Sequence, residues 1–209
     1  MSNVFVHMGI SLDGYVAGPN RGPKNPLGDG GVQIHDWMFK QRAFRRQLLL
    51  GEDGETGEDN RIVEALAGRI GANIMGKRMF EEGEANWPEE APFHTPVFVL
   101  TKEVRSPWER KGGTTFYFVS DGIHRALERA REAAGAKDVR ISGGRNVVLQ
   151  YLAAGLVDEL SLALSPVLLG EGLRLFEGVD TRAVALDVVE AIPSPSVTHL
   201  RYAVQKKKG

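Results

Sequence analysis

Short apolar segments alternate with segments of helical periodicity from the N-terminus to Leu156. The apolar segments are rich in β-branched residues, as buried strands are, whereas apolar residues in the segments between them recur every three or four positions. Strands that alternate with helices form parallel βαβ units with helices on both faces of the sheet. The predicted strands cover residues 4–8, 72–75, 96–100, 116–119 and 139–141.

Amphipathic segments between the strands predict the helices. Trp37, Phe44 and Leu48 lie seven and four residues apart, which places them on one face of a helix over residues 34–50. The later helices begin beside residues that commonly cap a helix or start one. These predicted starts are Asp59 or Asn60, Gly76, Ser120 or Asp121, and Gly144.

The pattern changes after residue 156 to strict alternation. Leu160, Leu162 and Leu164 fall on one side of a predicted strand, with serine and alanine on the other. Residues 184–189 and 197–204 predict two more strands. The C-terminal third is therefore expected to add antiparallel strands to a mostly parallel α/β sheet. Because no linker interrupts the pattern, we expect a single domain over residues 1–209, with 206–209 as a flexible tail.

Candidate binding residues follow several of the predicted strands. Gly76, Thr101 and Gly143 each come directly after or at the end of a strand, and Asp13 lies in the loop after the first one. Ligands of parallel α/β sheets bind beyond the carboxyl ends of the strands. These positions are therefore predicted to share one edge of the sheet.

The double glycine at residues 143 and 144 lies where a strand becomes a helix. Glycine lets a ligand approach the main chain, and the helix that follows offers unpaired N–H groups and the positive end of its dipole. This arrangement favours a phosphate or pyrophosphate. A tight strand-to-helix turn that binds nothing explains the two glycines equally well.

Composition narrows the class of protein. The chain has 26 Lys and Arg residues against 27 Asp and Glu, so its charge gives no general reason to bind nucleic acid. It contains no cysteine, which excludes disulfides, thiolate metal sites and cysteine nucleophiles. No segment resembles a signal peptide or a membrane span, so we expect a soluble, cytoplasmic protein.

Two further kinds of site lack support in the sequence. The five histidines are scattered without the spacing of metal ligands, so we expect no metal. No GxSxG motif surrounds any serine, so acyl-transfer chemistry is not indicated.

Five motifs in order resemble a known family. They are SLDGYVA at residues 11–17, IMGK at 74–77, LTK at 100–102, ISGG at 141–144 and PVLLGEG at 166–172. Together they resemble the C-terminal reductase domain of bacterial riboflavin biosynthesis and its stand-alone relatives. The resemblance implies a three-layer fold like that of dihydrofolate reductase, a homodimer and an NADPH-dependent reductase.

The resemblance also implies the cofactor site. Its glycine and basic residue at a helix start correspond to Gly76 and Lys77, and the pair at the adenosine 2′-phosphate corresponds to Thr101 and Lys102. The pyrophosphate loop and its approach correspond to Ser142, Gly143, Gly144, Arg145 and Asn146. The backbone that lines the nicotinamide corresponds to Gly9, Val16 and Ala17.

On the substrate side, the resemblance places Asp13 at the reducible end as a proton donor or relay, although an Asp before a Gly commonly stabilises a turn. Trp37 and Trp87 are candidates to stack on a planar ring, with an ordinary core position as the alternative. The expected substrate is a small heterocyclic imine or carbonyl compound such as a pteridine, a flavin precursor or a ribosylaminopyrimidine.

The chain departs from the family's pattern in two ways that affect the expected substrate. A chain without cysteine has no zinc deaminase half, and the segment 21–31 looks like that of stand-alone relatives, so a role in riboflavin synthesis is not implied. Dihydrofolate reduction itself lacks support, because Asp36 beside Trp37 is not a clear match for a pterin-binding acid. The alternative function is a non-catalytic NADP(H)-binding sensor or scaffold.

Overall fold

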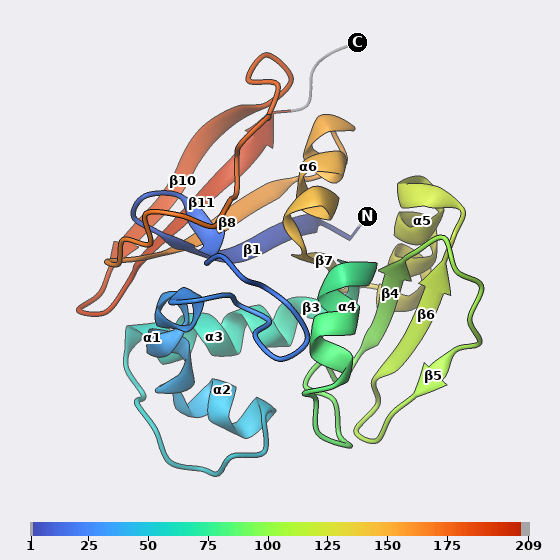
Figure 1. The fold of residues 1–209 in the computed structure, drawn as a ribbon, viewed down its shortest axis with the longest axis horizontal. Coiled ribbons are helices and arrows are strands. Elements are labelled where there is room, and N and C mark those ends of the chain that lie inside the picture. The colour runs from blue at the N-terminus through green and yellow to red at the C-terminus, as the bar shows by residue number, and fades with distance from the viewer. Residues whose placement is uncertain (1, 206–209) are drawn as a thin grey trace.

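The computed structural model describes residues 2–205 as two helical layers around a nine-stranded sheet (Figure 1). The strand order is β10-β11-β8-β1-β7-β3-β4-β6-β5. These strands are β1 (Val4–Ser11), β3 (Ile70–Gly76), β4 (Pro96–Leu100), β5 (Trp108–Glu109), β6 (Thr115–Val119), β7 (Asp138–Gly143), β8 (Glu159–Ser165), β10 (Ala185–Pro193) and β11 (Thr198–Gln205).

The centre of the sheet is parallel and its two edges are antiparallel. The strands from β8 through β1, β7, β3 and β4 to β6 pair in parallel, whereas β11, β10 and β5 are antiparallel to their neighbours. The predicted mixed, mostly parallel sheet with antiparallel C-terminal strands is confirmed. The alternating segment that forms β8 still belongs to the parallel part, because it pairs with β1.

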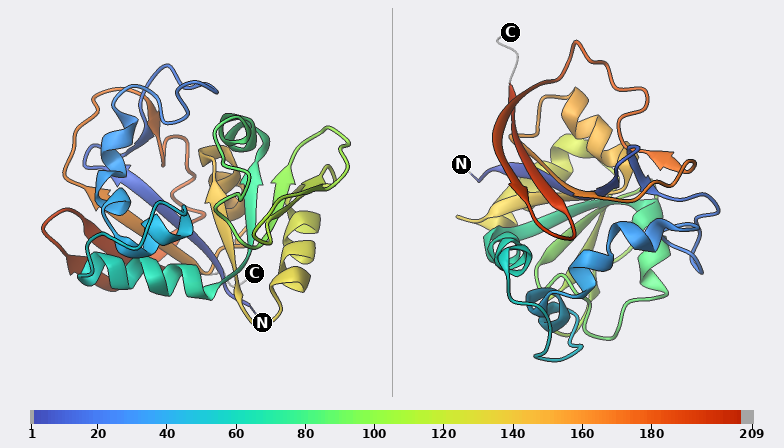
Figure 2. Two further views of the ribbon diagram at one scale, coloured as in Figure 1. Left: turned by 90° about the horizontal axis from the view of Figure 1, so that it is seen from below. Right: turned by 90° about the vertical axis from the view of Figure 1, so that its left-hand side faces the viewer.

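Helices cover both faces of the sheet, as Figure 2 shows. The helices α5 (Gly122–Ala134) and α6 (Arg145–Ala153) bury apolar side chains against one face of β1, β3 and β7. The other face carries α3 (Glu58–Arg69) and α4 (Lys77–Glu84). Along β7, Val139 and Ile141 point into the core with α5 and α6, so the residue between them points to the opposite face.

The predicted helix over residues 34–50 is broken into three short pieces, which corrects the sequence-based expectation. They are η1 (Gly31–Ile34), α1 (Asp36–Phe39) and α2 (Arg42–Gln47). Gln41 is extended because its neighbours pair with the following loop: Arg42 N–H donates to Glu55 O at 3.0 Å and Glu55 N–H to Lys40 O at 2.8 Å. Tertiary pairing therefore overrides the helical spacing.

The predicted cap of α3 is also corrected. The helix begins at Glu58 after Gly57, and both Asp59 and Asn60 lie within it. Their side chains make tertiary contacts instead: Asp59 accepts hydrogen bonds from the Ser194 hydroxyl and pairs with the His199 ring, and Asn60 accepts the Ala43 N–H at 2.7 Å. These contacts attach α3 to the C-terminal strands and to α2.

A small second sheet joins two loops that are distant in sequence. Its strands are β2 (Tyr15–Ala17) and β9 (Leu173–Arg174), neither of which the hydrophobic pattern predicts. At Gly172 the backbone has φ +128°, and a Cβ there would lie 2.3 Å from the Ala17 carbonyl oxygen. The loop after β1 and the loop before β9 are therefore packed backbone against backbone.

No helix among residues 2–205 is long and apolar enough to cross a membrane. The predicted flexible tail at 206–209 lies outside the described residues.

Candidate functional site

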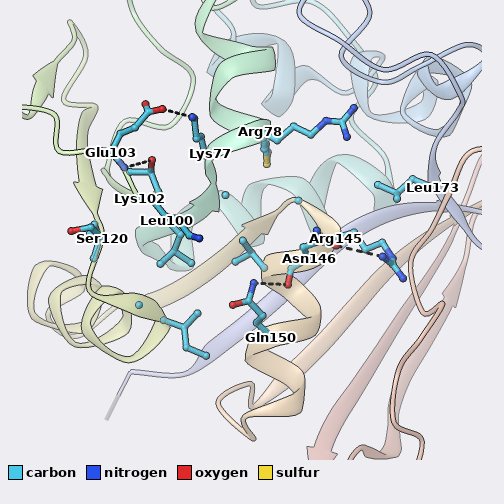
Figure 3. A pocket seen from close by; sticks show the side chains of 18 of the residues that line it. Lys77, Arg78, Leu100, Lys102, Glu103, Ser120, Arg145, Asn146, Gln150 and Leu173 are labelled. Carbon is cyan, nitrogen blue, oxygen red and sulfur yellow. Dashed lines mark hydrogen bonds and ion pairs between the residues drawn. The ribbon is translucent and has the colours of Figure 1, made fainter.

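A groove of about 640 Å³ lies at the carboxyl ends of the central parallel strands (Figure 3). The loops after β3, β4, β6 and β7 each contribute to it. Its walls include predicted residues from three of those loops, namely Gly76, Lys77, Thr101, Lys102, Gly144, Arg145 and Asn146. The structure thus brings together the strand-end residues that the sequence placed at one edge.

Three helices begin at this groove. The first residues of α4, α5 and α6 all line it, and none of the three N-caps, Gly76, Asp121 and Gly144, makes a side-chain hydrogen bond to its helix. The first backbone N–H groups of a helix have no partner within the helix. Three uncapped N-termini therefore present hydrogen-bond donors and positive dipole ends to one groove, which favours an anion.

The two glycines of the β7–α6 loop have different roles. Gly143 has φ +126°, and a Cβ there would lie 3.2 Å from Met79 Sδ, so the fold itself requires glycine. Gly144 has φ −71° and ψ −174°, an extended conformation that any residue adopts, and a Cβ there would meet nothing within 4 Å. Because packing does not require a glycine at 144, its open face is suited to a ligand.

Basic side chains outnumber acids in the groove. Its lining has one carboxylate, Glu103, against the basic residues Arg21, Lys77, Arg78, Lys102 and Arg145. Glu103 lies 2.5 Å from Lys77 Nζ, and this hydrogen bond raises the pKa of Lys77 (Figure 3). Lys102 forms no ion pair within 4.0 Å among residues 2–205, so its charge is available to an anionic ligand.

A second cavity of about 370 Å³ adjoins the groove on the α1–α4 side of the sheet. It is lined by Gly9, Val16, Ala17, Ser142, Trp37 and Trp87, all of which the sequence analysis proposed for the site. Five residues line both spaces: Arg21, Met79, Gly144, Arg145 and Leu173. The groove and the second cavity therefore meet beside the double glycine, although Gly143 itself lines neither.

The two tryptophans of the second cavity are held by aromatic contacts. The ring of Trp87 stacks on Phe116 with centroids 5.1 Å apart and planes 7° apart. Trp37 is only 3% exposed and meets His199 edge to face at 5.0 Å. Both rings are parts of the cavity wall, and Trp37 is mainly a core residue.

The sequence analysis missed several polar side chains of the second cavity, and His7, His35 and Arg140 are the ones that lie together on the sheet side of it or beside it. Burial lowers the pKa of Arg140 to about 10, and burial together with the charge of Arg140 lowers the pKa of His7 to about 3 and that of His35 to about 4. At neutral pH Arg140 is charged and both imidazoles are neutral. The sequence signal that could have identified Arg140 is the presence of a basic residue between the apolar residues Val139 and Ile141 of a buried strand.

Asp13 lies outside the linings of both spaces. Its carboxylate accepts the Ser11 hydroxyl at 2.6 Å and the backbone N–H groups of Gly170 at 2.7 Å and Leu169 at 3.1 Å. These hydrogen bonds lower its pKa to about 2, so the group is ionised at neutral pH. The contacts attach the loop after β1 to the loop before β9.

Residues 2–200 match the RibD C-terminal domain family. Uncharacterized protein YyaP of Bacillus subtilis is 26% identical over 179 residues, which cover 86% of this chain and 82% of YyaP. A structure from Shewanella sp. PV-4, named for riboflavin biosynthesis, aligns with a TM-score of 0.66 and 21% identity over 98% of this chain and 99% of that one.

Two further structures share the fold. The deaminase and 5-amino-6-(5-phosphoribosylamino)uracil reductase of Thermotoga maritima gives a TM-score of 0.62 at 15% identity, with 98% of this chain covering 57% of that one. Dihydrofolate reductase of Enterococcus faecalis, complexed with NADP(H), gives 0.53 at 12% identity, over 97% of this chain and 96% of that one.

The chain shares the mixed α/β fold of dihydrofolate reductase. The chain belongs to the RibD C-terminal domain family.

The neutral histidines predict a pH-dependent stability. As the pH falls below about 6.5, His35 takes up a proton in the unfolded chain but not in the folded one until about pH 4, so the free energy of unfolding decreases over this window. One such histidine changes it by up to about 1.4 kcal/mol per pH unit. We expect His35→Gln to flatten the pH dependence measured by urea denaturation between pH 4 and 7.

The matched control is His124→Gln, at an exposed position on α5. This variant should leave the pH dependence of the free energy of unfolding unchanged. An equal pH dependence in wild type and His35→Gln would show that His35 does not cause it.

Proposed function

We propose that the chain is an NADPH-dependent reductase that transfers a hydride to a small heterocyclic imine or carbonyl compound, of the pteridine, flavin-precursor or ribosylaminopyrimidine type. The observation that carries the proposal is the junction at Gly144, where a basic groove meets a cavity walled by aromatic rings. A hydride donor and its acceptor need adjoining binding spaces. Family membership supports the same class of activity.

The groove suits the phosphates of such a cofactor. In the proposal the pyrophosphate binds the uncapped N–H groups at Gly144, Arg145 and Asn146, where a Cβ-sized space is open. Thr101 and Lys102 receive the adenosine 2′-phosphate, and Gly76 and Lys77 complete the wall. The nicotinamide supplies the hydride when it is bound, with Gly9, Val16, Ala17 and Ser142 along the second cavity as its surroundings.

The second cavity favours the reductase over a non-catalytic NADP(H)-binding protein. A sensor or scaffold needs only the groove, whereas this chain keeps a space of about 370 Å³ beside it. Trp87 offers aromatic surface there, Trp37 is a largely buried part of the wall, and the apolar walls exclude water from a reacting ring. We therefore place the substrate in the second cavity.

Consumption of NADPH is the direct test of the function. Purified protein should oxidise NADPH when it is supplied with at least one member of a panel of pteridines, flavins and ribosylaminopyrimidines. Tight NADPH binding without turnover on the whole panel would instead favour the sensor or scaffold.

The open face of Gly144 predicts a selective loss of cofactor binding. Gly144→Val places a branched side chain where the pyrophosphate approaches the backbone, so the dissociation constant for NADPH should rise at least about tenfold with little change in Tm. Calorimetric titration measures the dissociation constant, and a thermal melt measures Tm. Wild type should also prefer NADPH to NADH, because Lys102 meets a group that NADH lacks.

Gly57→Val is the matched control for that variant. Gly57 is likewise an extended helix N-cap with nothing within 4 Å of its Cβ position, but it lies at α3, away from the groove. If both variants bind NADPH as wild type does, the double glycine is not part of the cofactor site.

The proposed catalytic role of Asp13 competes with its contacts as a loop anchor. If Asp13 donates or relays a proton, Asp13→Asn should bind NADPH normally and lose about 10²–10⁴-fold in kcat. If it only anchors the loop at residues 169–170, the variant should melt at a lower temperature while the folded enzyme keeps its turnover. The second result would remove Asp13 from the catalytic site.

We also propose a homodimer that buries the edge strand β10. This strand lies at the end of the sheet and exposes Leu186 by 41%, Val188 by 73% and Val189 by 49%. An unpaired apolar edge is a ready site for pairing with a second copy. Light scattering should give a dimer for wild type and a monomer for Val188→Glu, whereas Val104→Glu, at a position 97% exposed outside β10, should remain dimeric. A monomeric wild type at micromolar concentration would contradict the proposal.

A further inference from the structure

Arg140 projects from the centre of the sheet into the second cavity. It lies on β7 between Phe5 of β1 and Asn73 of β3, and its neighbours Val139 and Ile141 point to the opposite face. Its side chain is mostly buried and lines the cavity together with His7 and His35. A cation is therefore placed at the floor of the space proposed for the substrate.

The guanidinium of Arg140 has little compensation within residues 2–205. Its one hydrogen bond is a long one, from Nη2 to the His7 carbonyl oxygen at 3.4 Å, and its Nε is buried without a partner. No carboxylate of the described residues lies within 4.0 Å of it. By contrast, Arg69 on the same face is held by Asp138 and Glu159 at 2.8 Å each.

The rest of the cavity leaves this charge unopposed. The one carboxylate in its lining, Glu82, is engaged by Arg21 at 2.5 Å and by Arg78 at 3.1 Å. His7 and His35 are neutral at neutral pH, and His7 Nδ1 is also buried without a partner. A buried charge is unfavourable unless it is paired, so the arrangement fits a site completed by an anion from outside the chain.

The charge and the position together limit the kind of anion. Arg21 and Arg145 also line this cavity, but both also line the groove, so they lie where the two spaces meet. Away from that junction, the guanidinium of Arg140, flanked by neutral imidazoles, balances a single negative charge, and its planar fork matches a carboxylate. A phosphate dianion would leave excess negative charge in a space with apolar walls. Arg140 lies two residues before Ser142 on an extended strand, so its Cα is about 6–7 Å from that of Ser142, a spacing comparable to the long dimension of a fused two-ring system.

We propose that Arg140 binds a carboxylate of the substrate, which makes that substrate a planar ring compound with a single acidic group distal to the reducible bond. That the ligand is a substrate rests on the proposed reductase function, but binding of a carboxylate at Arg140 does not require turnover. Selection of a carboxylate would distinguish this chain from a reductase that selects a phosphorylated compound. Arg140 acts here as a specificity-determining residue.

Equilibrium binding of three matched probes tests the assignment without any reduction. Quinoline-2-carboxylate, quinoline-2-carboxamide and phenyl phosphate are titrated by calorimetry into the protein with and without NADPH. Wild type should bind the carboxylate about tenfold to hundredfold more tightly than the carboxamide, since hydrogen bonds to charged groups have this strength. Equal affinities, or a preference for phenyl phosphate, would overturn the proposal.

Variants then assign the preference to Arg140. Arg140→Met should abolish the preference for the carboxylate, and Arg140→Lys should keep part of it, because lysine retains the charge without the planar fork. Arg61→Met removes the same charge from an exposed site on α3 and should change nothing. A carboxylate preference that survives in Arg140→Met would also overturn the proposal.

Stability separates ligand binding from a structural role. Removal of an unpaired buried cation should leave the Tm of Arg140→Met unchanged or raise it, whereas a structural arginine would lower it. If the probes bind as expected but no panel compound is reduced, the reductase function fails and the carboxylate site stands. If NADPH is oxidised only with uncharged or phosphorylated compounds, the reductase stands and the carboxylate site fails.

Discussion

Parallel pairing of the central strands is the constraint on which the site depends. Because β7, β3, β4 and β6 run in the same direction, the helices that follow three of them, α6, α4 and α5, must all begin at one edge of the sheet. The unpaired N–H groups and positive dipole ends are thereby concentrated in one groove before any side chain is considered. Basic side chains then strengthen a preference for anions that the backbone already provides.

The hydrophobic pattern predicted this framework because it depends on local repetition. The strand at Pro96–Leu100 and the end of α5 at Gly135 follow directly from apolar periodicity and a glycine stop, and the residues at strand ends then fall at one edge. The sequence left the double glycine open between a turn and a ligand site. The structure separates the two residues, since Gly143 has a positive φ whereas Gly144 has neither strain nor a close neighbour.

What the sequence did not predict depends on contacts between distant segments. The break at Gln41 follows from pairing with Glu55, and β2 forms only because β9 lies beside it. Besides its local contact with Ser11, Asp13 accepts hydrogen bonds from residues 169–170, more than 150 positions away. To predict the role of Arg140, one must know which face of β7 lies over a cavity. The pattern of a short strand does not show which of its two faces that is.

The wall shared by the two spaces has a thermodynamic consequence. Arg145 lines both spaces and also donates to the Glu177 carbonyl oxygen, so a ligand that reorients its guanidinium in the groove alters the second cavity as well. Linkage makes such an effect reciprocal: any factor by which the first ligand changes the affinity for the second is the factor by which the second changes the affinity for the first. The order in which the two ligands arrive therefore affects the rates along each route but not the stability of the ternary complex.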